Sequence, residues 1–193
     1  FLAPVTLTDG DELVVFQTNA LAPGLFSGTA TRSIPSAIDF AAGDLNGDGQ
    51  PDIAVRTPTG FAIFAQDRAT TDGLDSGSTI AESAAGPFAF ADVNSDGAAD
   101  LVFARPGASD LAVRLRDRLN QTFAAPVSLV ARTNISAVTI ADVDGDSRAD
   151  LVVTSGAGLV EVFRRDHAAG ISFSLFTSFD AGGPALETRV LNL

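Results

Sequence analysis

Short apolar runs separated by polar turns recur along this chain, and they predict β-strands. A typical stretch has Ala137-Val-Thr-Ile140, a polar loop, Leu151-Val-Val153, a glycine turn and then Leu159-Val-Glu-Val-Phe163. Apolar and polar residues alternate in such runs, and several are rich in β-branched residues, as half-buried strands require. No segment has the 3.6-residue period of an amphipathic helix. The hydrophobic pattern therefore predicts an all-β protein.

This arrangement of strands occurs three times in register. The loops between the first and second predicted strands begin at Asp44, Asp92 and Asp142, which are 48 and 50 residues apart. The predicted first strands are 37–40, 88–90 and 137–140, the second 53–55, 101–103 and 151–153, the third 61–64, 111–115 and 159–163, and the fourth lie around 79–80, 123–129 and 171–176. Four short strands in a unit of this length are typical of a β-propeller blade.

The two ends of the chain predict parts of a further blade. Residues 2–7, 13–16 and 25–31 have the pattern of second, third and fourth strands, and 185–193 that of a first strand. A first residue other than Met predicts processing or excision from a longer chain. We therefore expect a single domain, 1–193, of about four blades of four antiparallel strands, whose terminal strands share one blade. The ring is expected to be a small whole propeller or part of a larger one.

The loop after each first strand carries the strongest chemical signal. In each loop, positions 1, 3, 5 and 9 bear side chains with oxygen atoms, and an aliphatic strand follows immediately. A loop that curls around a cation turns every second side chain inward, and Ca²⁺ prefers hard oxygen ligands. Three such loops predict about three Ca²⁺ ions. Because the side chains nearly fill the coordination shell, the ions are expected to be structural.

These loops resemble the FG-GAP and VCBS repeats of integrin α-subunit β-propellers and of many secreted bacterial proteins, most strongly over 36–163. The resemblance implies Ca²⁺ bound by the side chains of each loop and by the main-chain carbonyl at position 7. The implied ligands are Asp44, Asn46, Asp48, Gln50 and Asp52 in the first loop, Asp92, Asn94, Asp96, Ala98 and Asp100 in the second, and Asp142, Asp144, Asp146, Arg148 and Asp150 in the third.

One position departs from the repeated loop pattern. Position 6 is Gly49 in the first loop and Gly97 in the second, but Ser147 in the third. This position often needs a positive φ, which glycine adopts without steric cost. We therefore expect the third loop to be strained or differently shaped.

Composition excludes several classes of function. The net charge is −12, yet ten of the 24 acidic residues are loop aspartates, so three Ca²⁺ ions would leave about −6. Nucleic-acid binding is disfavoured by this charge. All 12 basic residues are arginine and there is no cysteine, so a catalytic lysine or thiolate is excluded. No run of about 18 apolar residues predicts a transmembrane segment.

Two further features have alternative interpretations. The single histidine, His167, lies among charged residues and predicts a solvated turn, and no Gly-x-Ser-x-Gly pattern is present, so we expect no enzymatic activity. Arg114, Arg116 and Arg118 alternate, as they would on one face of a strand. That face would either bind an anionic or acidic partner or, as we favour, protect the edge of a blade from pairing.

The sequence therefore predicts a calcium-binding, non-enzymatic interaction or adhesion scaffold that is secreted or exposed at the cell surface. Its partner is a protein or a glycan, and self-association to complete a ring is possible. The alternative is a calcium-stabilised lectin of the integrin-like propeller type. Sugars usually stack on Trp or Tyr, and the chain contains neither, which disfavours the lectin.

Overall fold

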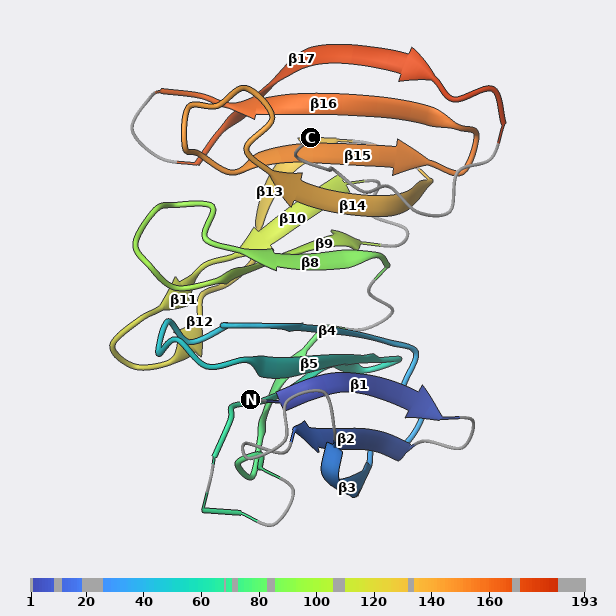
Figure 1. The fold of residues 1–193 in the computed structure, drawn as a ribbon. Coiled ribbons are helices and arrows are strands. Elements are labelled where there is room, and N and C mark those ends of the chain that lie inside the picture. The colour runs from blue at the N-terminus through green and yellow to red at the C-terminus, as the bar shows by residue number, and fades with distance from the viewer. Residues whose placement is uncertain are drawn as a thin grey trace. The chain divides into compact units, whose positions relative to one another are not determined.

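A computed structural model shows that the chain is built from β-strands, as the sequence predicts (Figure 1). It describes residues 2–8, 12–18, 26–67, 69–70, 73–82, 86–105, 110–131, 134–167 and 171–183. Chain contacts divide it into two compact units, Phe1–Ala84 and Ala85–Leu193. Within the described residues, no helix is long and apolar enough to cross a bilayer.

The first unit contains two antiparallel sheets. One has three strands in sequence order, β1 (Leu2–Thr8), β2 (Glu12–Thr18) and β3 (Phe26–Ser33). The other has four, β4 (Asp39–Gly43), β5 (Asp52–Thr57), β6 (Gly60–Phe64) and β7 (Ser78–Ala81), also in sequence order. Its buried core includes Ile53 and Val55 of β5 and Phe64 of β6. The continuous apolar run of β5 is explained by its central place in the sheet, where both faces are covered.

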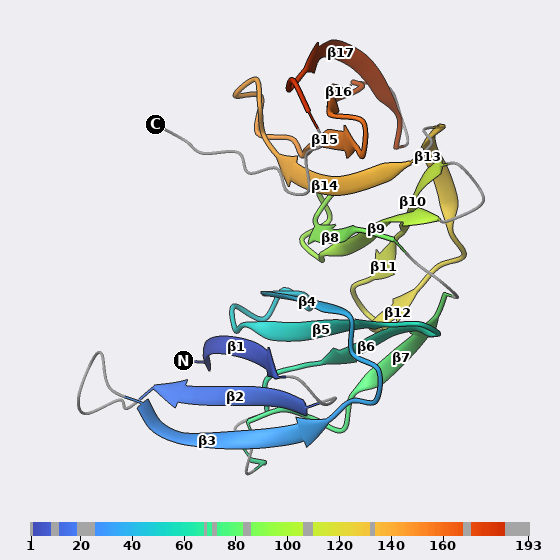
Figure 2. The same ribbon diagram turned by 90° about the vertical axis from the view of Figure 1, so that its right-hand side faces the viewer.

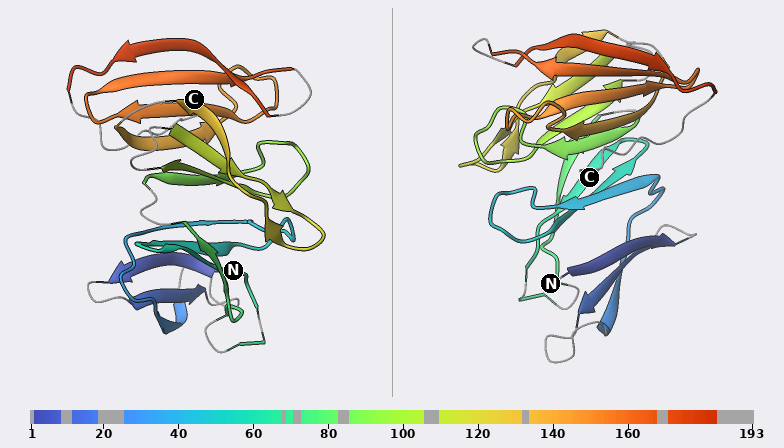
Figure 3. Two further views of the ribbon diagram at one scale, coloured as in Figure 1. Left: turned by 180° about the vertical axis from the view of Figure 1, so that it is seen from behind. Right: turned by 45° about the horizontal axis from the view of Figure 1, so that its top comes forward.

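The second unit contains two four-stranded antiparallel sheets (Figure 2). One consists of β8 (Phe88–Ala91), β9 (Asp100–Arg105), β10 (Asp110–Arg114) and β13 (Val127–Ala131). The other consists of β14 (Ile135–Ala141), β15 (Asp150–Ser155), β16 (Leu159–Arg165) and β17 (Phe173–Asp180), and Figure 3 shows these strands in orange to red. Strand β14 lies beside β8, so the first strands of the two sheets are neighbours. Their shared core includes Val102, Leu111, Leu151 and Val153.

The three Asp-rich loops occupy the same place in their sheets. Each joins the first strand to the second, from β4 to β5, from β8 to β9 and from β14 to β15. The strands of each sheet then follow one another in sequence order, with a separate two-stranded hairpin between β10 and β13. The predicted fold class is confirmed at this level, since four-stranded antiparallel sheets with one loop type are what propeller blades contain.

The prediction for residues 114–129 is wrong in two respects. The predicted strand 123–129 is divided, because β12 (Thr122–Phe123) pairs with β11 (Arg116–Asp117) while β13 begins at Val127. Arg114, Arg116 and Arg118 therefore do not share one strand face. Arg116 is buried, with its guanidinium 5.2 Å from the centre of the Phe123 ring and bonded to Gln121 Oε1.

The Asp117 carboxylate explains why the strand is interrupted. It accepts hydrogen bonds from the main-chain N–H groups of Leu119 and Asn120 and so fixes a tight turn. The predicted strand 185–193 lies outside the described residues. Its sharing of a blade with the N-terminal strands, and the closure of a ring, stay predictions.

Candidate metal site

The three Asp-rich loops fold around the carboxylate at their first position. We call them loop 1 (44–52), loop 2 (92–100) and loop 3 (142–150). In loop 3, Asp142 Oδ1 accepts from the N–H of Gly145 at 2.7 Å and Oδ2 from that of Ser147 at 2.8 Å. Asp44 and Asp92 accept the matching bond from position 6, each at 2.8 Å. The repeated sequence therefore folds into a repeated loop.

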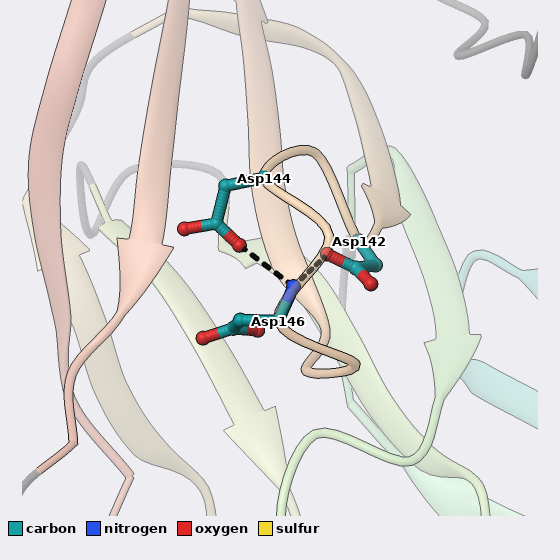
Figure 4. Close-up of side chains that lie close together, drawn as sticks. All are labelled: Asp142, Asp144 and Asp146. Carbon is teal, nitrogen blue, oxygen red and sulfur yellow. Dashed lines mark hydrogen bonds between the residues drawn. The ribbon is translucent and has the colours of Figure 1, made fainter.

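Loop 3 brings three carboxylates together at the protein surface. Oxygen atoms of Asp142, Asp144 and Asp146 all lie within 4.8 Å of one another, and Figure 4 shows the three side chains around the loop. Oxygen ligands of one Ca²⁺ lie 2.3–2.6 Å from the ion, so two of them are at most about 5 Å apart. The cluster therefore could hold a metal ion with all three carboxylates in its shell.

Two arginines and the single histidine lie beside the same cluster. Arg164 Nε lies 3.0 Å from Asp144 Oδ2, and Arg148 Nε lies 4.0 Å from Asp146 Oδ2. His167 Nε2 lies 3.9 Å from the same Asp146 oxygen, although its side chain is 78% exposed. The sequence placed His167 in a solvated turn but gave no sign of this contact. The two guanidinium groups offset part of the repulsion among the carboxylates.

Loops 1 and 2 have asparagine at position 3 and use it to join positions 3 and 5. Asn46 Nδ2 donates to Asp48 Oδ2 at 3.2 Å, while its Oδ1 accepts from the Asp48 N–H at 2.9 Å. Asn94 makes the same two bonds with Asp96, at 2.7 and 2.9 Å. Positions 1, 3 and 5 therefore converge in these loops as they do in loop 3.

Position 7 contributes a main-chain donor to each loop. The N–H groups of Gln50, Ala98 and Arg148 donate to the carboxylate at position 5, at 2.8, 2.8 and 2.9 Å. This bond points the position 5 carboxylate back into the loop. The role of the three carbonyls as ligands stays a prediction.

The aspartate at position 9 lies in a different environment from the others. Asp52, Asp100 and Asp150 are at most 1% exposed. One oxygen of each accepts from the N–H at loop position 2, at 3.0, 3.1 and 3.0 Å. The other accepts from the residue that follows or ends the third strand, Gln66, Arg116 or Arg165, at 2.9, 2.8 and 2.9 Å. Sequence reasoning missed this joining role, and ligation by these three stays a prediction.

The pKa values of buried and exposed aspartates are shifted in opposite directions. Burial raises the pKa of Asp52 and raises that of Asp100 to about 6, and the nearby carboxylates of Asp96 and Asp92 add to the latter shift. The pKa of exposed Asp142 is instead lowered, mainly because the Ser147 N–H stabilises its charged form. A cation held by the loop would favour the charged form of every one of these groups.

Two positions in each loop require a left-handed backbone. At position 6, φ is 80° for Gly49, 86° for Gly97 and 66° for Ser147. The expected left-handed strain at Ser147 is therefore present, although the loop keeps the bond from the position 6 N–H to the first aspartate. Position 4 is also left-handed in all three loops, with Gly47 at 77°, Ser95 at 65° and Gly145 at 81°. The recurrence of Gly at position 4 was the available signal for this second requirement.

Comparisons with known proteins identify the repeat. A family model described as FG-GAP-like repeat matches residues 44–103 and 92–153, so each match begins at an Asp-rich loop. No curated protein matches this chain. Among solved structures, a chain of the Photorhabdus luminescens Tc holotoxin pore is similar, with a TM-score of 0.43 and 17% sequence identity over 94% of this chain. The match spans only 11% of the length of that chain.

Proposed function

Because this chain belongs to the FG-GAP-like repeat family, we propose that it is a calcium-stabilised, non-enzymatic interaction module that acts outside the cell. The observation that carries the proposal is the convergence of Asp142, Asp144 and Asp146 in loop 3. Loops 1 and 2 share with loop 3 the bonds that the N–H groups of positions 5, 6 and 7 donate to its carboxylates, which supports one ion for each loop and three in all.

The donor set favours calcium over softer metals. Every side chain that converges in the loops offers carboxylate or amide oxygen, and the loops contain neither histidine nor cysteine. Oxygen donors in a short flexible loop are the ligands of Ca²⁺, whereas zinc and copper sites are built from imidazole and thiolate. The proposed side-chain ligands are those at positions 1, 3, 5 and 9 of each loop, with the carbonyl at position 7 completing the shell.

The place outside the cell follows from the calcium sites that we propose. Loops of this kind in extracellular modules bind Ca²⁺ with dissociation constants of about 10⁻⁴ to 10⁻³ M, so they need millimolar calcium. A cytosol with far less free calcium would leave such sites empty.

The outermost strand of the second unit supports a role in binding another protein. Leu175, Phe176 and Phe179 of β17 are each at least half exposed, and the strand lies at the edge of its sheet. Large apolar side chains gathered on an exposed strand mark an interaction surface. The partner class we propose is a protein, with a second copy of this chain as the first to test by light scattering.

Thermal unfolding with and without calcium tests the proposal. At 10 mM Ca²⁺, each occupied site is expected to stabilise the folded state by about 1.4 to 2.7 kcal/mol, given the dissociation constants above. Each kcal/mol corresponds to about 2 to 4 °C in a chain of this size. EDTA should therefore lower the Tm by several degrees, and Mg²⁺ at equal concentration should restore little of it.

Calorimetry then tests the assignment to loops. Asp96→Ala is expected to reduce the stoichiometry by one ion, while Asp67→Ala, an acidic residue outside the loops, should leave it unchanged. An identical melting curve in calcium and in excess EDTA would contradict the proposal. An unchanged stoichiometry in Asp96→Ala would contradict the ligand assignment in loop 2.

A further inference from the structure

Arg165, at the end of β16, makes hydrogen bonds to two different loops. Its main-chain N–H donates to Asp150 Oδ1 of loop 3 at 2.9 Å. Its guanidinium donates to Ser95 Oγ at 2.9 Å and to the Asn94 carbonyl at 3.2 Å, both in loop 2. Ser95 precedes Arg165 by 70 residues, so this side chain joins two successive repeats.

Loop 3 fixes the point from which this side chain extends. The Asp150 carboxylate that binds the Arg165 N–H is buried, and its other oxygen accepts from the Val143 N–H at 3.0 Å. The backbone of Arg165 is therefore tied to the first turn of loop 3. A rearrangement of that turn would be transmitted through Asp150 to the guanidinium.

The Arg165 guanidinium binds a turn of loop 2 that has an unfavourable backbone conformation. Ser95 has a φ of 65°, a left-handed conformation that is costly for a residue other than glycine. It lies between Asn94 and Asp96, two of the proposed ligands. The planar guanidinium donates two bonds at once to this turn, which a lysine cannot reproduce with the same geometry. Arg165 thus holds the turn that presents both ligands.

The two loops also face a common space. Residues of both line an open hollow of about 720 Å³, among them Ser95 and Asp96 of loop 2 and Asp142 and Ser147 of loop 3. By contrast, Arg116 holds the equivalent position after β10 but directs its guanidinium to Gln121 within its own hairpin. The connection by Arg165 is therefore a property of loops 2 and 3 rather than of every repeat position.

We propose that Arg165 is a positioning residue that couples loops 2 and 3, so that Ca²⁺ bound in loop 3 strengthens Ca²⁺ binding in loop 2. This inference rests on the proposed function, since it requires the loops to bind the ion. Linkage makes the effect reciprocal, and couplings of this kind commonly change affinity at least fivefold.

Electrostatic repulsion alone would change the Ca²⁺ affinity of loop 2 in the opposite direction. A guanidinium beside loop 2 repels an incoming cation, so its removal alone would tighten Ca²⁺ binding there. Loss of positioning would instead weaken it. Arg165→Gln and Arg165→Lys separate the two effects, because lysine keeps the charge and loses the planar fork.

The experiment is a Ca²⁺ titration of the whole chain, monitored by amide NMR and by calorimetry. The Gly97 N–H reports loop 2, and the Gly145 N–H reports loop 3. Arg165→Gln and Arg165→Lys are both expected to lower the Ca²⁺ affinity of loop 2 about fivefold. The matched control is Arg114→Gln, whose guanidinium bonds the Ala124 carbonyl away from the loops and which should leave loop 2 affinity within twofold.

A double-mutant cycle isolates the coupling itself. Asp146→Ala, which disables loop 3, should weaken loop 2 about fivefold when Arg165 is present and by less than twofold in Arg165→Gln. Ser95→Ala removes one acceptor of the Arg165 guanidinium and leaves β16 unchanged. It should also weaken Ca²⁺ binding at loop 2, and it replaces the arginine variants if these fail to fold.

The outcomes distinguish the inference from the function on which it rests. Loop 2 affinity that is unchanged or tighter in Arg165→Gln overturns the coupling while leaving calcium binding intact. Equal effects of Asp146→Ala in both backgrounds also overturn it. If neither glycine amide moves in millimolar Ca²⁺, the proposed function fails, and the coupling fails with it.

Discussion

The aspartates of one loop occupy two opposite environments. In loop 3, Asp142, Asp144 and Asp146 are exposed residues whose carboxylate oxygens lie within 4.8 Å of one another. Four residues further on, Asp150 is 1% exposed and accepts hydrogen bonds from two main-chain N–H groups. The same chemical group thus serves two purposes within nine residues.

The difference shows what each kind of carboxylate depends on. A buried carboxylate that accepts two N–H bonds is satisfied by the protein itself, and it joins the start of the loop to the third strand. The exposed carboxylates of Asp142, Asp144 and Asp146 repel one another; Asp142 accepts N–H bonds within its own loop, while Asp144 and Asp146 lie beside arginines, and a cation would offset the repulsion that is left. Burial, rather than residue type, therefore separates the architecture of the loop from its proposed ion site.

The largest effect expected from this comparison concerns stability without calcium. Asp100→Ala leaves the Val93 and Arg116 N–H groups without their acceptor, at a cost of about 1 to 3 kcal/mol each. Asp96→Ala removes an exposed carboxylate and should change the free energy of unfolding by less than about 1 kcal/mol. Urea unfolding in EDTA measures both. Similar losses in the two variants would show that the buried and exposed positions do not differ as described.

Much of the fold could be predicted because its signals are local. The apolar runs at 53–55, 101–103 and 151–153 become the central strands β5, β9 and β15, since only a strand covered on both faces tolerates a continuous apolar run. The turn residues between them are mostly Gly and Pro, which limit the strand ends. The Asp-rich loops could be predicted from the spacing of their oxygen-bearing side chains, which does not depend on the surrounding sequence.

What could not be predicted depends on burial and on distant partners. The spacing of oxygen-bearing residues predicts the same ligand role for Asp142 and Asp150. The sequence does not show that Asp150 is buried and accepts a hydrogen bond from the N–H of Arg165. The division of 123–129 was missed because the alternation of Arg114, Arg116 and Arg118 imitates a strand. The turn made by Asp117 outweighs that alternation, since its carboxylate satisfies two N–H groups locally.

The pH dependence of the metal-free protein should separate the same two environments. The pKa of Asp100 is raised to about 6, so the folded state binds this proton more tightly than the unfolded state does. The contribution of Asp100 to the free energy of unfolding therefore falls as pH rises from about 4 to about 6, by about 3 kcal/mol at most. The lowered pKa of Asp142 gives the opposite slope, since its stabilising effect is lost as pH falls.

Urea unfolding at several pH values in metal-free buffer measures this slope. Asp100→Asn should remove most of the decline between pH 4 and 6, because an amide does not titrate there. Asp180→Asn, at an exposed aspartate outside the loops, serves as the control and should keep the decline. An identical pH profile in Asp100→Asn and the unaltered chain would contradict the assignment to the buried carboxylate.

A smaller effect is expected at the left-handed position 6, where loops 1 and 3 differ. Ser147 has a φ of 66° where Gly49 has 80°, so Ser147→Gly should stabilise the fold by about 0.5 to 1 kcal/mol. Gly49→Ser is the matched reverse change and should destabilise it by a similar amount. An added Cβ at Gly49 meets nothing within 4 Å, so its cost is conformational rather than steric. Stabilisation by both substitutions would show that strain does not limit these loops.

The smallest effect is expected at His167, which tests whether proximity to the loop is enough to matter. Its Nε2 lies 3.9 Å from Asp146 Oδ2, but the side chain is 78% exposed, and solvent screens such a contact. His167→Ala should therefore change the free energy of unfolding by less than about 0.5 kcal/mol. Ca²⁺ affinity at loop 3 should also stay within twofold of the unaltered chain by the Gly145 amide. A larger change would mean that the exposed carboxylates depend on their neighbours as strongly as Asp150 depends on its N–H donors.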